Sequence, residues 1–374
     1  MAAFRDCDVV VLGSSNVDLV TTVERLPNKG ETVHGTSFAQ HFGGKGANQA
    51  VQCARLGSKT RFIGAVGGDD NGRSYLEHLT KVPNMDTSCV RVAAGTSTGV
   101  AQISVDAAAQ NTIVVVAGAN GTLSPEDVLL CQDSAAFRGA KVLLCQLENP
   151  RAATLAAVEA ARESGTLSII NTAPAPESDD PAALATLLAA PDIICCNEPE
   201  LSLISGGMPT STQNEIDAAA TAVLARGCQS VLVTMGARGA CFYSFVSKGL
   251  TKALKVPTNE VSPLDTTGAG DSFLGALAHG LSRCRHTLVG EGADLMAAMG
   301  EGMAEGPAAG NICALEAACQ CASLSVLAPG AQSSFPTADQ IEHKRTFDAA
   351  INGERPPPNL WPCADGIRRE GYYQ

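Results

Sequence analysis

Basic residues are scarce in this chain. The 374-residue sequence holds 26 lysines and arginines against 38 aspartates and glutamates, which gives a formal net charge of −12. A field of this sign repels polyanions, so nucleic acid and acidic membrane surfaces are excluded as expected partners. A small anionic ligand would need a local positive site.

Motifs for metal sites and redox pairs are also absent. The 14 cysteines include no CxxC pair, and the 6 histidines show no HExxH spacing, so a zinc site is not expected. Several cysteines lie inside apolar runs such as KVLLCQLE and DIICCNE. This placement favours reduced, buried thiols.

Long hydrophobic runs and targeting signals are missing as well. No stretch approaches the ~18 apolar residues that a membrane-spanning helix needs. The first strand-like run, DVVVLGS, starts within a few residues of Met1 and leaves no room for a signal peptide, and the final GYYQ matches no C-terminal sorting signal. We expect a soluble, cytoplasmic protein.

Short β-rich runs alternate with longer alanine- and leucine-rich amphipathic stretches. KVLLCQL, TLSIINT, DIICCNE and SVLVTMG read as strands, and segments such as RAATLAAVEAARESG between them read as helices. Strands this apolar are buried on both faces, and helices between them suit crossovers. The pattern predicts an α/β fold with a doubly wound, mostly parallel sheet flanked by helices.

Two segments break this alternation. Residues 32–42 and 97–117 read as strands and turns without a crossover helix, and they predict a small β-sheet lid over a site, with an ordinary edge hairpin as the alternative. We expect one α/β domain over residues 1–351, with lid strands from about 20–42 and 97–117 and an insert at about 283–310. Residues 352–374, which include the single tryptophan, read as a C-terminal tail.

The segment DTTGAGD leads directly into an apolar helical pattern, in which Phe273, Leu274, Leu277 and Leu281 share one face. The loop therefore presents free backbone N–H groups at a helix N-terminus, which is a suitable place for a phosphate. Glycine and alanine leave these amides accessible. In the alternative interpretation, Asp271 is only the N-cap of the helix.

Two common nucleotide motifs do not fit. In GGKGAN, Lys45 is followed by Gly46 rather than by serine or threonine, and Ala39 stands where a P-loop has its first glycine. After the first strand, Gly13 has no companion glycines at the dinucleotide-binding spacing. Neither a Walker A loop nor a Rossmann cofactor site is expected.

Polar residues gather where the predicted strands end. Asn16 and Asp18 follow the first strand, Asn48 lies near the start of the helix in GGKGANQAVQCARLG, and Glu148 ends KVLLCQLE. The carboxyl ends of parallel strands form the binding crevice of an open α/β sheet, so these groups could converge on hydroxyls. Each has a plainer interpretation as a turn, helix-start or surface residue.

The motifs together resemble the PfkB sugar-kinase superfamily, and within it the ribokinase group. They occur in the expected order from about residue 9 to 336, and they read GSSNVDLV, GETVHG, FGGKGANQA, STGVA, QLE, NTAPA, NEPE, TMGARGA, DTTGAGDSF and PGAQSS. The resemblance implies a ribokinase-like fold and ATP-dependent phosphorylation of D-ribose at its 5-hydroxyl. It also implies Mg²⁺, activation by K⁺, and a homodimer formed through the β lids.

The resemblance also assigns residues to the two substrates. Asp271 would be the catalytic base, and the backbone amides of Gly268, Ala269 and Gly270 would form an anion hole. The residues implied for D-ribose are Asn16, Asp18, Gly44, Lys45, Gly46, Ala47, Asn48 and Glu148, with Ala101, Ile103 and Val115 from the lid. Those implied for ATP are Asn197, Thr234, Met235, Gly236, Ala237, Arg238, Gly239 and Cys319, besides Gly270 and Asp271.

Two cation sites follow from the same resemblance. Asn197 and Glu200 form the NxxE pattern associated with Mg²⁺ through water. The K⁺ site would consist of Asp265, Thr267, Ser325, Ala328, Gly330 and Ser334. Since positioning and electrostatics carry most of phosphoryl transfer, an exposed-type carboxylate would suffice as the base.

Two other functions stay open. A kinase of the same superfamily could act on adenosine, fructose phosphate or a keto-deoxy sugar acid, but a sugar phosphate would call for more basic residues than Lys45. A catalytically silent sugar- or nucleotide-binding module is the second. The presence of Asp271 together with GAG, NxxE and Lys45 argues against it.

Overall fold

The structure is a computed structural model that describes residues 6–108, 110–133, 136–176, 180–247, 250–284, 288–290, 294–300 and 313–341. The described strands form a nine-stranded sheet and a separate four-stranded sheet. The strand order of the large sheet is β13-β12-β11-β10-β9-β8-β1-β4-β5. Its strands are β1 (Val9–Leu12), β4 (Thr60–Gly67), β5 (Met85–Ala93), β8 (Val142–Cys145), β9 (Leu167–Asn171), β10 (Ile193–Asn197), β11 (Ser230–Thr234), β12 (Ala240–Ser247) and β13 (Leu250–Val256).

All neighbours from β11 to β5 pair in parallel, and β12 and β13 add an antiparallel edge. The central strands VVVL and VLLC are buried along their whole length. Alternate residues of β1 enter different cores, because Val9 and Val11 belong to one apolar cluster and Val10 and Leu12 to the other. Burial on both faces is what continuous apolar strands require.

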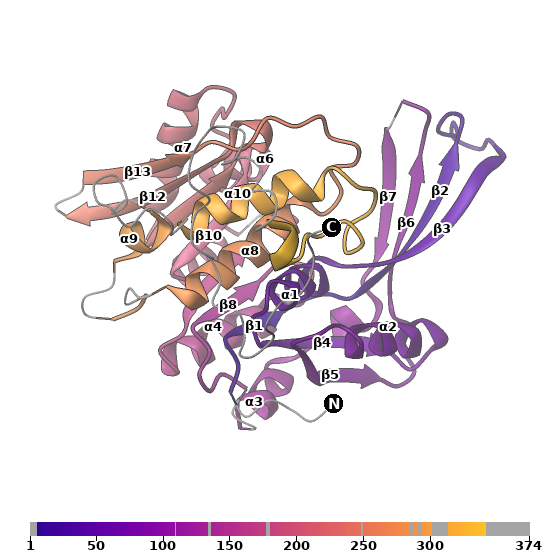
Figure 1. The fold of residues 1–374 in the computed structure, drawn as a ribbon, viewed down its shortest axis with the longest axis horizontal. Helices are drawn as coiled ribbons and strands as arrows, with labels where there is room; N and C mark the ends of the chain where they lie inside the picture. Colours follow the sequence, from indigo (N-terminus) through magenta and orange to yellow (C-terminus); the bar gives the residue numbers. More distant parts are fainter. Residues whose placement is uncertain are drawn as a thin grey trace, which may run out of the picture.

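Helices cover both faces of the large sheet (Figure 1). The helices of one apolar cluster are α1 (Lys45–Arg55), α2 (Asp70–Thr80), α8 (Ala269–Arg283), α9 (Leu295–Met299) and α10 (Ala314–Ser325). The other cluster takes α3 (Pro125–Asp133), α4 (Arg151–Glu163), α5 (Pro181–Ala189), α6 (Glu198–Ser205) and α7 (Gln213–Leu224). The predicted doubly wound α/β fold is confirmed.

The second sheet projects from this core (Figure 1). Its order is β3 (Gly35–Gly43), β2 (Asn16–Val23), β6 (Gly99–Val105) and β7 (Asn111–Val116). Every residue of β7 and most of β3 are exposed, so this sheet lacks the double cover of the core. The predicted small second sheet is confirmed, the alternative of a simple edge hairpin is wrong, and its role as a lid stays a prediction.

The insert expected at about 283–310 is described only in part. Arg283 ends α8, and α9 packs Met296 and Met299 into the same apolar cluster as α8. The remainder of the insert and the tail at 352–374 lie outside the described residues.

The expectations drawn from absent motifs can be compared with the described ranges. Most of the 13 cysteines described there are buried. Within those ranges no cluster of three or more histidine, cysteine or acidic side chains could hold a metal. The described helices also include none with the length and apolarity needed to cross a bilayer.

Candidate active site

The GAGD segment forms the N-terminus of α8. Gly268 is the N-cap with a left-handed φ of 74°, and no side chain caps the helix. A Cβ on Gly268 would lie 2.9 Å from Cβ of Ala331, whereas a Cβ on Gly270 would meet nothing within 4 Å. Gly270 therefore borders open space, whereas the Ala269 N–H already donates to the Thr266 carbonyl oxygen at 3.2 Å. Asp271 is the third residue of the helix, so the interpretation that it is the N-cap is wrong.

Asp271 is held from α1 rather than from its own helix. Asn48 Nδ2 donates to its Oδ2 at 2.9 Å, and Gln49 Nε2 donates to its Oδ1 at 3.0 Å. The two helices approach closely because Gly275 has no side chain: a Cβ there would lie 2.7 Å from the Gln49 carbonyl oxygen.

Asp271 is only 9 % exposed, so it is not the exposed-type carboxylate that was considered sufficient from the sequence. Burial raises its pKa, and the Lys45 charge and the Asn48 and Gln49 amides offset part of that rise. The raised pKa means that Asp271, which would have to accept a proton, binds it more tightly than an exposed aspartate would. Gln49 was not among the residues found from the sequence.

Lys45 lies among four carboxyl groups. Burial alone would lower its pKa, but the charges of Asp271, Glu148, Glu200 and Asp18 together raise it. Its Nζ is 4.0 Å from Glu148 Oε1, and its backbone N–H donates to Glu148 Oε2 at 3.3 Å. Ser14 Oγ also donates to Glu148. The lysine is the local positive site that an acidic protein needs for an anion.

Asp18 projects from the lid toward this cluster. Its carboxylate lies over Gly43, where a Cβ would come within 2.1 Å of Oδ2. Burial, followed by repulsion from Glu148 and Asp271, raises its pKa to about 7, and Lys45 opposes the rise. The folded state therefore binds this proton more tightly than the unfolded state does.

We expect Asp18→Asn to stabilise the protein at pH 8 by roughly 1–3 kcal/mol and to have no effect near pH 4. Near pH 4 and below, Asp18 is protonated in the folded protein and costs nothing. Between about pH 4 and pH 7 the folded state still holds a proton that the unfolded state has released, so stability falls across that range and levels off above it. Urea unfolding at both pH values measures the difference, and an equal gain at pH 4 and pH 8 would contradict this origin.

The lid residues implied for the sugar share a face with Asp18. In the strand register Asp18 pairs with Ala101, which pairs with Val115, so the three lie in one row across β2, β6 and β7. Ile103 is two residues further along the same face. Ala101 is buried and Val115 is exposed. Asn16 starts β2, and its Oδ1 accepts from Asn120 Nδ2 at 2.7 Å.

Gly44 is the N-cap of α1 with a φ of 89°. Gly46 and Ala47, which the sequence placed with the sugar, pack against the end of β1. Gly46 packs on the backbone of Gly13, and the Ala47 N–H donates to the Ser14 carbonyl oxygen at 2.9 Å. Both residues dock α1 on the end of β1 and thereby position Lys45 and Asn48.

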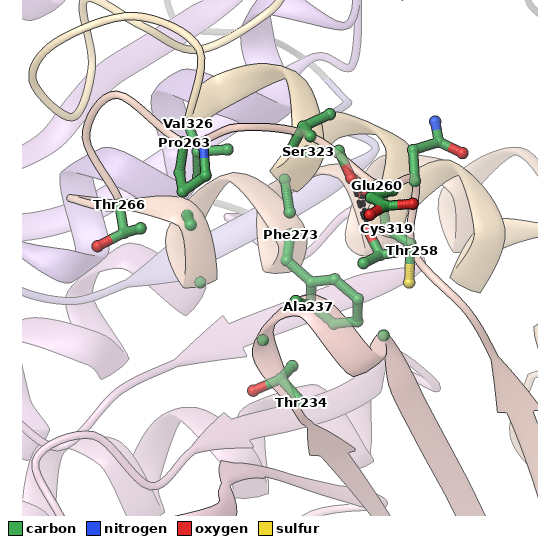
Figure 2. Close-up of a pocket in the computed structure, with 17 residues that line it drawn as sticks. Thr234, Ala237, Thr258, Glu260, Pro263, Thr266, Phe273, Cys319, Ser323 and Val326 are labelled. Atoms are coloured by element: carbon green, nitrogen blue, oxygen red, sulfur yellow. Dashed lines mark hydrogen bonds between the residues drawn. The ribbon is translucent and has the colours of Figure 1, made fainter.

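A cavity of about 620 Å³ lies between the α8 N-terminus, the turn after β11 and α10. Phe273 stands between Thr258, Cys319 and Ser323 on one side and Pro263 and Val326 on the other (Figure 2). Thr234, Gly236, Ala237 and Gly239 also line it, as the sequence predicted for the ATP stretch. Burial raises the pKa of the Cys319 thiol to about 12, so the thiol is neutral.

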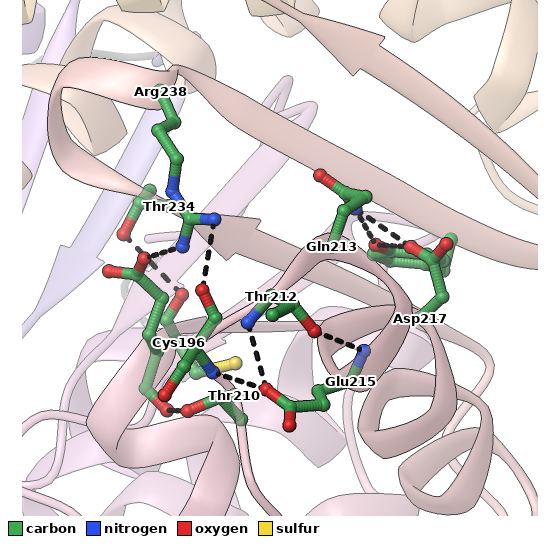
Figure 3. Close-up of polar contacts among 11 residues, drawn as sticks. Cys196, Thr210, Thr212, Gln213, Glu215, Asp217, Thr234 and Arg238 are labelled. Atoms are coloured by element: carbon green, nitrogen blue, oxygen red, sulfur yellow. Dashed lines mark hydrogen bonds and ion pairs between the residues drawn. The ribbon is translucent and has the colours of Figure 1, made fainter.

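Two residues of that stretch are placed elsewhere. Met235 is buried in the core. Arg238 turns away from the cavity to pair with Glu198 and to donate to the Ser211 carbonyl oxygen at 3.4 Å (Figure 3). Their side chains brace the turn after β11. Thr258, Asn259, Glu260 and Ser323 line the cavity instead and were not predicted.

A second cavity, of about 180 Å³, adjoins the first at the α8 N-terminus. Lys45, Asn197, Glu200 and Asp271 line it, and Ala269 and Gly270 border both cavities. Asn197 Oδ1 accepts from the Glu200 N–H at 2.8 Å, and Glu200 Oε2 accepts from the Asn197 N–H at 2.9 Å. Burial raises the pKa of Glu200. The N-terminus of α8, the lysine and the two carboxyl groups thus converge.

The residues implied for K⁺ lie in two segments that Asp265 joins. Its Oδ1 accepts from the Thr267 N–H at 2.9 Å, and its Oδ2 accepts from the Gly330 N–H at 2.7 Å. Burial would raise the pKa of Asp265, but these hydrogen bonds hold it below its usual value. Ser325 and Ser334 donate to the carbonyl oxygens of Ala322 and Ala331. Ala328 lies between them, in the segment that precedes Gly330.

A lid beside a buried carboxylate and an open helix N-terminus is the kind of site that a small-molecule kinase uses. The family of carbohydrate kinases called pfkB matches residues 6–338. The chain belongs to the pfkB family of carbohydrate kinases.

Several relatives within this family are ribokinases. A ribokinase of Mus musculus is 44 % identical over 270 residues, which is 72 % of this chain and 80 % of the relative. One of Staphylococcus aureus is 36 % identical over 334 residues, covering 89 % and 98 %. The structure of Arabidopsis thaliana ribokinase complexed with ribose and ATP superposes with a TM-score of 0.72 at 29 % identity, covering 90 % of this chain and 98 % of that one.

Proposed function

We propose that this chain catalyses ATP-dependent phosphorylation of D-ribose at O5, giving ribose 5-phosphate. The observation that carries the proposal is the position of Asp271, which lines the smaller cavity beside the helix amides that both cavities share. The larger cavity would take the nucleotide, and the sugar would lie beside Lys45 and Asp271, which line the smaller cavity.

In this mechanism Asp271 accepts the proton of the 5-hydroxyl as that oxygen attacks the γ-phosphate of ATP. Its raised pKa makes it a better proton acceptor than an exposed aspartate. The amides of Ala269 and Gly270, with Lys45 nearby, would stabilise charge on the phosphoryl oxygens. Asn16, Asp18, Glu148 and Asn48 would hold the other hydroxyls, with Ala101, Ile103 and Val115 above them.

The residues present fit the two implied cations. Glu200 and Asn197 would hold Mg²⁺ through water, since Mg²⁺ prefers oxygen ligands and usually keeps several waters beside substrate phosphates. When bound, Mg²⁺ neutralises phosphate charge. Asp265, with hydroxyl and carbonyl oxygens of the 325–334 segment, would supply an oxygen-only set of low charge to K⁺. Contacts from Asp265 and the 325–334 segment would stabilise the shape of the loop that contains Gly268.

The lid also supports self-association. Ile113, Val114 and Val116 on the edge strand β7 are each at least half exposed, and Phe38 is 64 % exposed, which is unusual for an unpaired edge. We expect a homodimer through the lids at micromolar concentration, and Val114→Lys should shift it toward monomer. Sedimentation velocity measures this, with Leu203→Lys on α6 as the exposed-aliphatic control. A monomeric wild type would contradict the assignment.

A coupled ADP-release assay with a sugar panel tests the function. D-ribose should be the best substrate, and 2-deoxy-D-ribose belongs in the panel because a Salmonella typhi deoxyribokinase is 33 % identical over 336 residues. Fructose phosphate and adenosine represent the other kinases, and K⁺ is exchanged for Na⁺ in a parallel series. ADP release with none of these acceptors would leave the silent binding module as the better account.

A further inference from the structure

Each oxygen of the Asp271 carboxylate accepts from a side-chain amide that is itself held by a second amide. On one side Gln332 Nε2 donates to Asn48 Oδ1 at 3.0 Å, and Asn48 Nδ2 donates to Asp271 Oδ2 at 2.9 Å. On the other side Gln146 Nε2 donates to Gln49 Oε1 at 2.6 Å, and Gln49 Nε2 donates to Asp271 Oδ1 at 3.0 Å. All four amides are buried.

The direction of these bonds matters because an amide can turn either its N–H₂ or its carbonyl oxygen toward a neighbour. An ionised carboxylate accepts only, but once it has taken a proton it can donate and would favour the reversed amide. Gln332 and Gln146 donate to the oxygens of Asn48 and Gln49, and so oppose that reversal. Asp271 therefore keeps N–H donors on both oxygens in either protonation state.

Gln332 is itself fixed by two residues of α2, which in turn contact the end of β3. Its Oε1 is 2.8 Å from His78 Nε2, and its Nε2 is 3.2 Å from the Tyr75 hydroxyl. Tyr75 donates to the Gly43 carbonyl oxygen, and the Phe42 ring stacks on His78 with centroids 4.5 Å apart. Gln332 thus joins α2, the end of lid strand β3 and the 329–334 segment to the carboxylate.

Gln146 is fixed by close packing after β8. It is fully buried, and a Cβ on Gly13 would lie 2.0 Å from its Oε1. The Gln146 side chain therefore occupies the space that a side chain at Gly13 would need.

We propose that Gln332 and Gln146 are positioning residues that act on Asp271 through Asn48 and Gln49. They keep the carboxylate aimed and hydrogen-bonded while it exchanges a proton. The proposal rests on Asp271 being the base in the function proposed above. Besides the amides, the charged groups acting on Asp271 are Lys45 and Glu148, and the charge of Asp271 in turn raises the pKa of Asp18.

Replacement of either outer amide by methionine tests this. Gln332→Met and Gln146→Met should each lower kcat about tenfold, since a hydrogen bond serving a charged group is affected. The acid limb of the kcat–pH profile should move upward, because weaker donation to the carboxylate raises its pKa. The KM for ATP should change less than the kcat.

Gln52→Met is the matched control. Gln52 is also a buried amide on α1 and also bonds toward α8 and the 329–336 segment, through Ser272 and the Pro336 carbonyl oxygen. It should lose thermal stability like the other two variants and keep its kcat and pH profile. The two relay variants are independent, so one that folds poorly leaves the other to decide.

The outcomes separate the two proposals. If Gln332→Met and Gln146→Met retain wild-type kcat and an unmoved acid limb while Asp271→Asn is inactive, the positioning role is wrong and the base assignment stands. If Asp271→Asn remains active, the base assignment itself fails. If Gln52→Met loses kcat as much as the relay variants do, the loss reflects packing and the relay is refuted.

Discussion

We expect Asp271→Asn to lower kcat for ribose phosphorylation by roughly 10²–10⁴-fold, the range typical of removing a general base. Asparagine keeps the shape of the side chain but cannot accept the hydroxyl proton. Asn48 and Gln49 would still contact it, so the KM values should change far less than kcat. Steady-state ADP release at saturating ribose and ATP measures the effect.

The fold should survive this change. Removing a buried charge whose pKa is raised by desolvation offsets the loss of one of the two amide hydrogen bonds, because asparagine has a single acceptor oxygen. Asp70→Asn is the matched control, since Asp70 has an 89 % exposed side chain on α2. Undiminished turnover in purified Asp271→Asn would refute the assignment, and a fall in Asp70→Asn would point to a non-specific effect.

The sequence predicted those parts of the fold and site that depend on local pattern. Runs such as VVVL and VLLC are apolar at every position, which only a sheet covered on both faces satisfies. DTTGAGD followed by an apolar helical face placed the small residues Gly268 to Gly270 and Asp271 at one helix start. Both conclusions needed only nearest neighbours along the chain.

Burial and the direction of polar contacts were not predictable in this way. Asp271 reads as an ordinary helix-start aspartate, and its burial follows from α1 lying across it. Gln146 and Gln332 are about 100 and 280 residues from their partners Gln49 and Asn48. One signal was present: Gln49 and Gln52 interrupt the apolar face of α1, where an amide must have a buried partner.

The turn after β11 shows a second limit of what the sequence could predict. TMGARG was taken as one ATP-contacting stretch, but Met235 points into the core and Arg238 pairs with Glu198. Consecutive residues in a tight turn point in different directions, so a motif locates a segment and does not say which of its side chains faces the ligand.

The second large effect is expected from Gly46→Ala. A Cβ on Gly46 would lie 2.4 Å from Cα of Gly13 and 2.6 Å from the Ser14 backbone nitrogen. Both are main-chain atoms, so no rotamer change relieves the overlap and α1 must move away from β1. A shift of about 1 Å can cost roughly 10²-fold in rate, and strain of this kind costs about 1–3 kcal/mol of stability.

The loss in Gly46→Ala should therefore appear in kcat as well as in the melting temperature, because Lys45, Asn48 and Gln49 move with α1. Gly121→Ala is the control, since its Cβ would make an ordinary 3.5 Å contact with Ala117 Cβ. A destabilised Gly46→Ala that keeps full turnover would mean that the base tolerates displacement of its donors. The glycines of GGKG would then serve folding alone. A loss of turnover would mean instead that they let α1 pack closely on β1 and so hold the catalytic carboxylate in position.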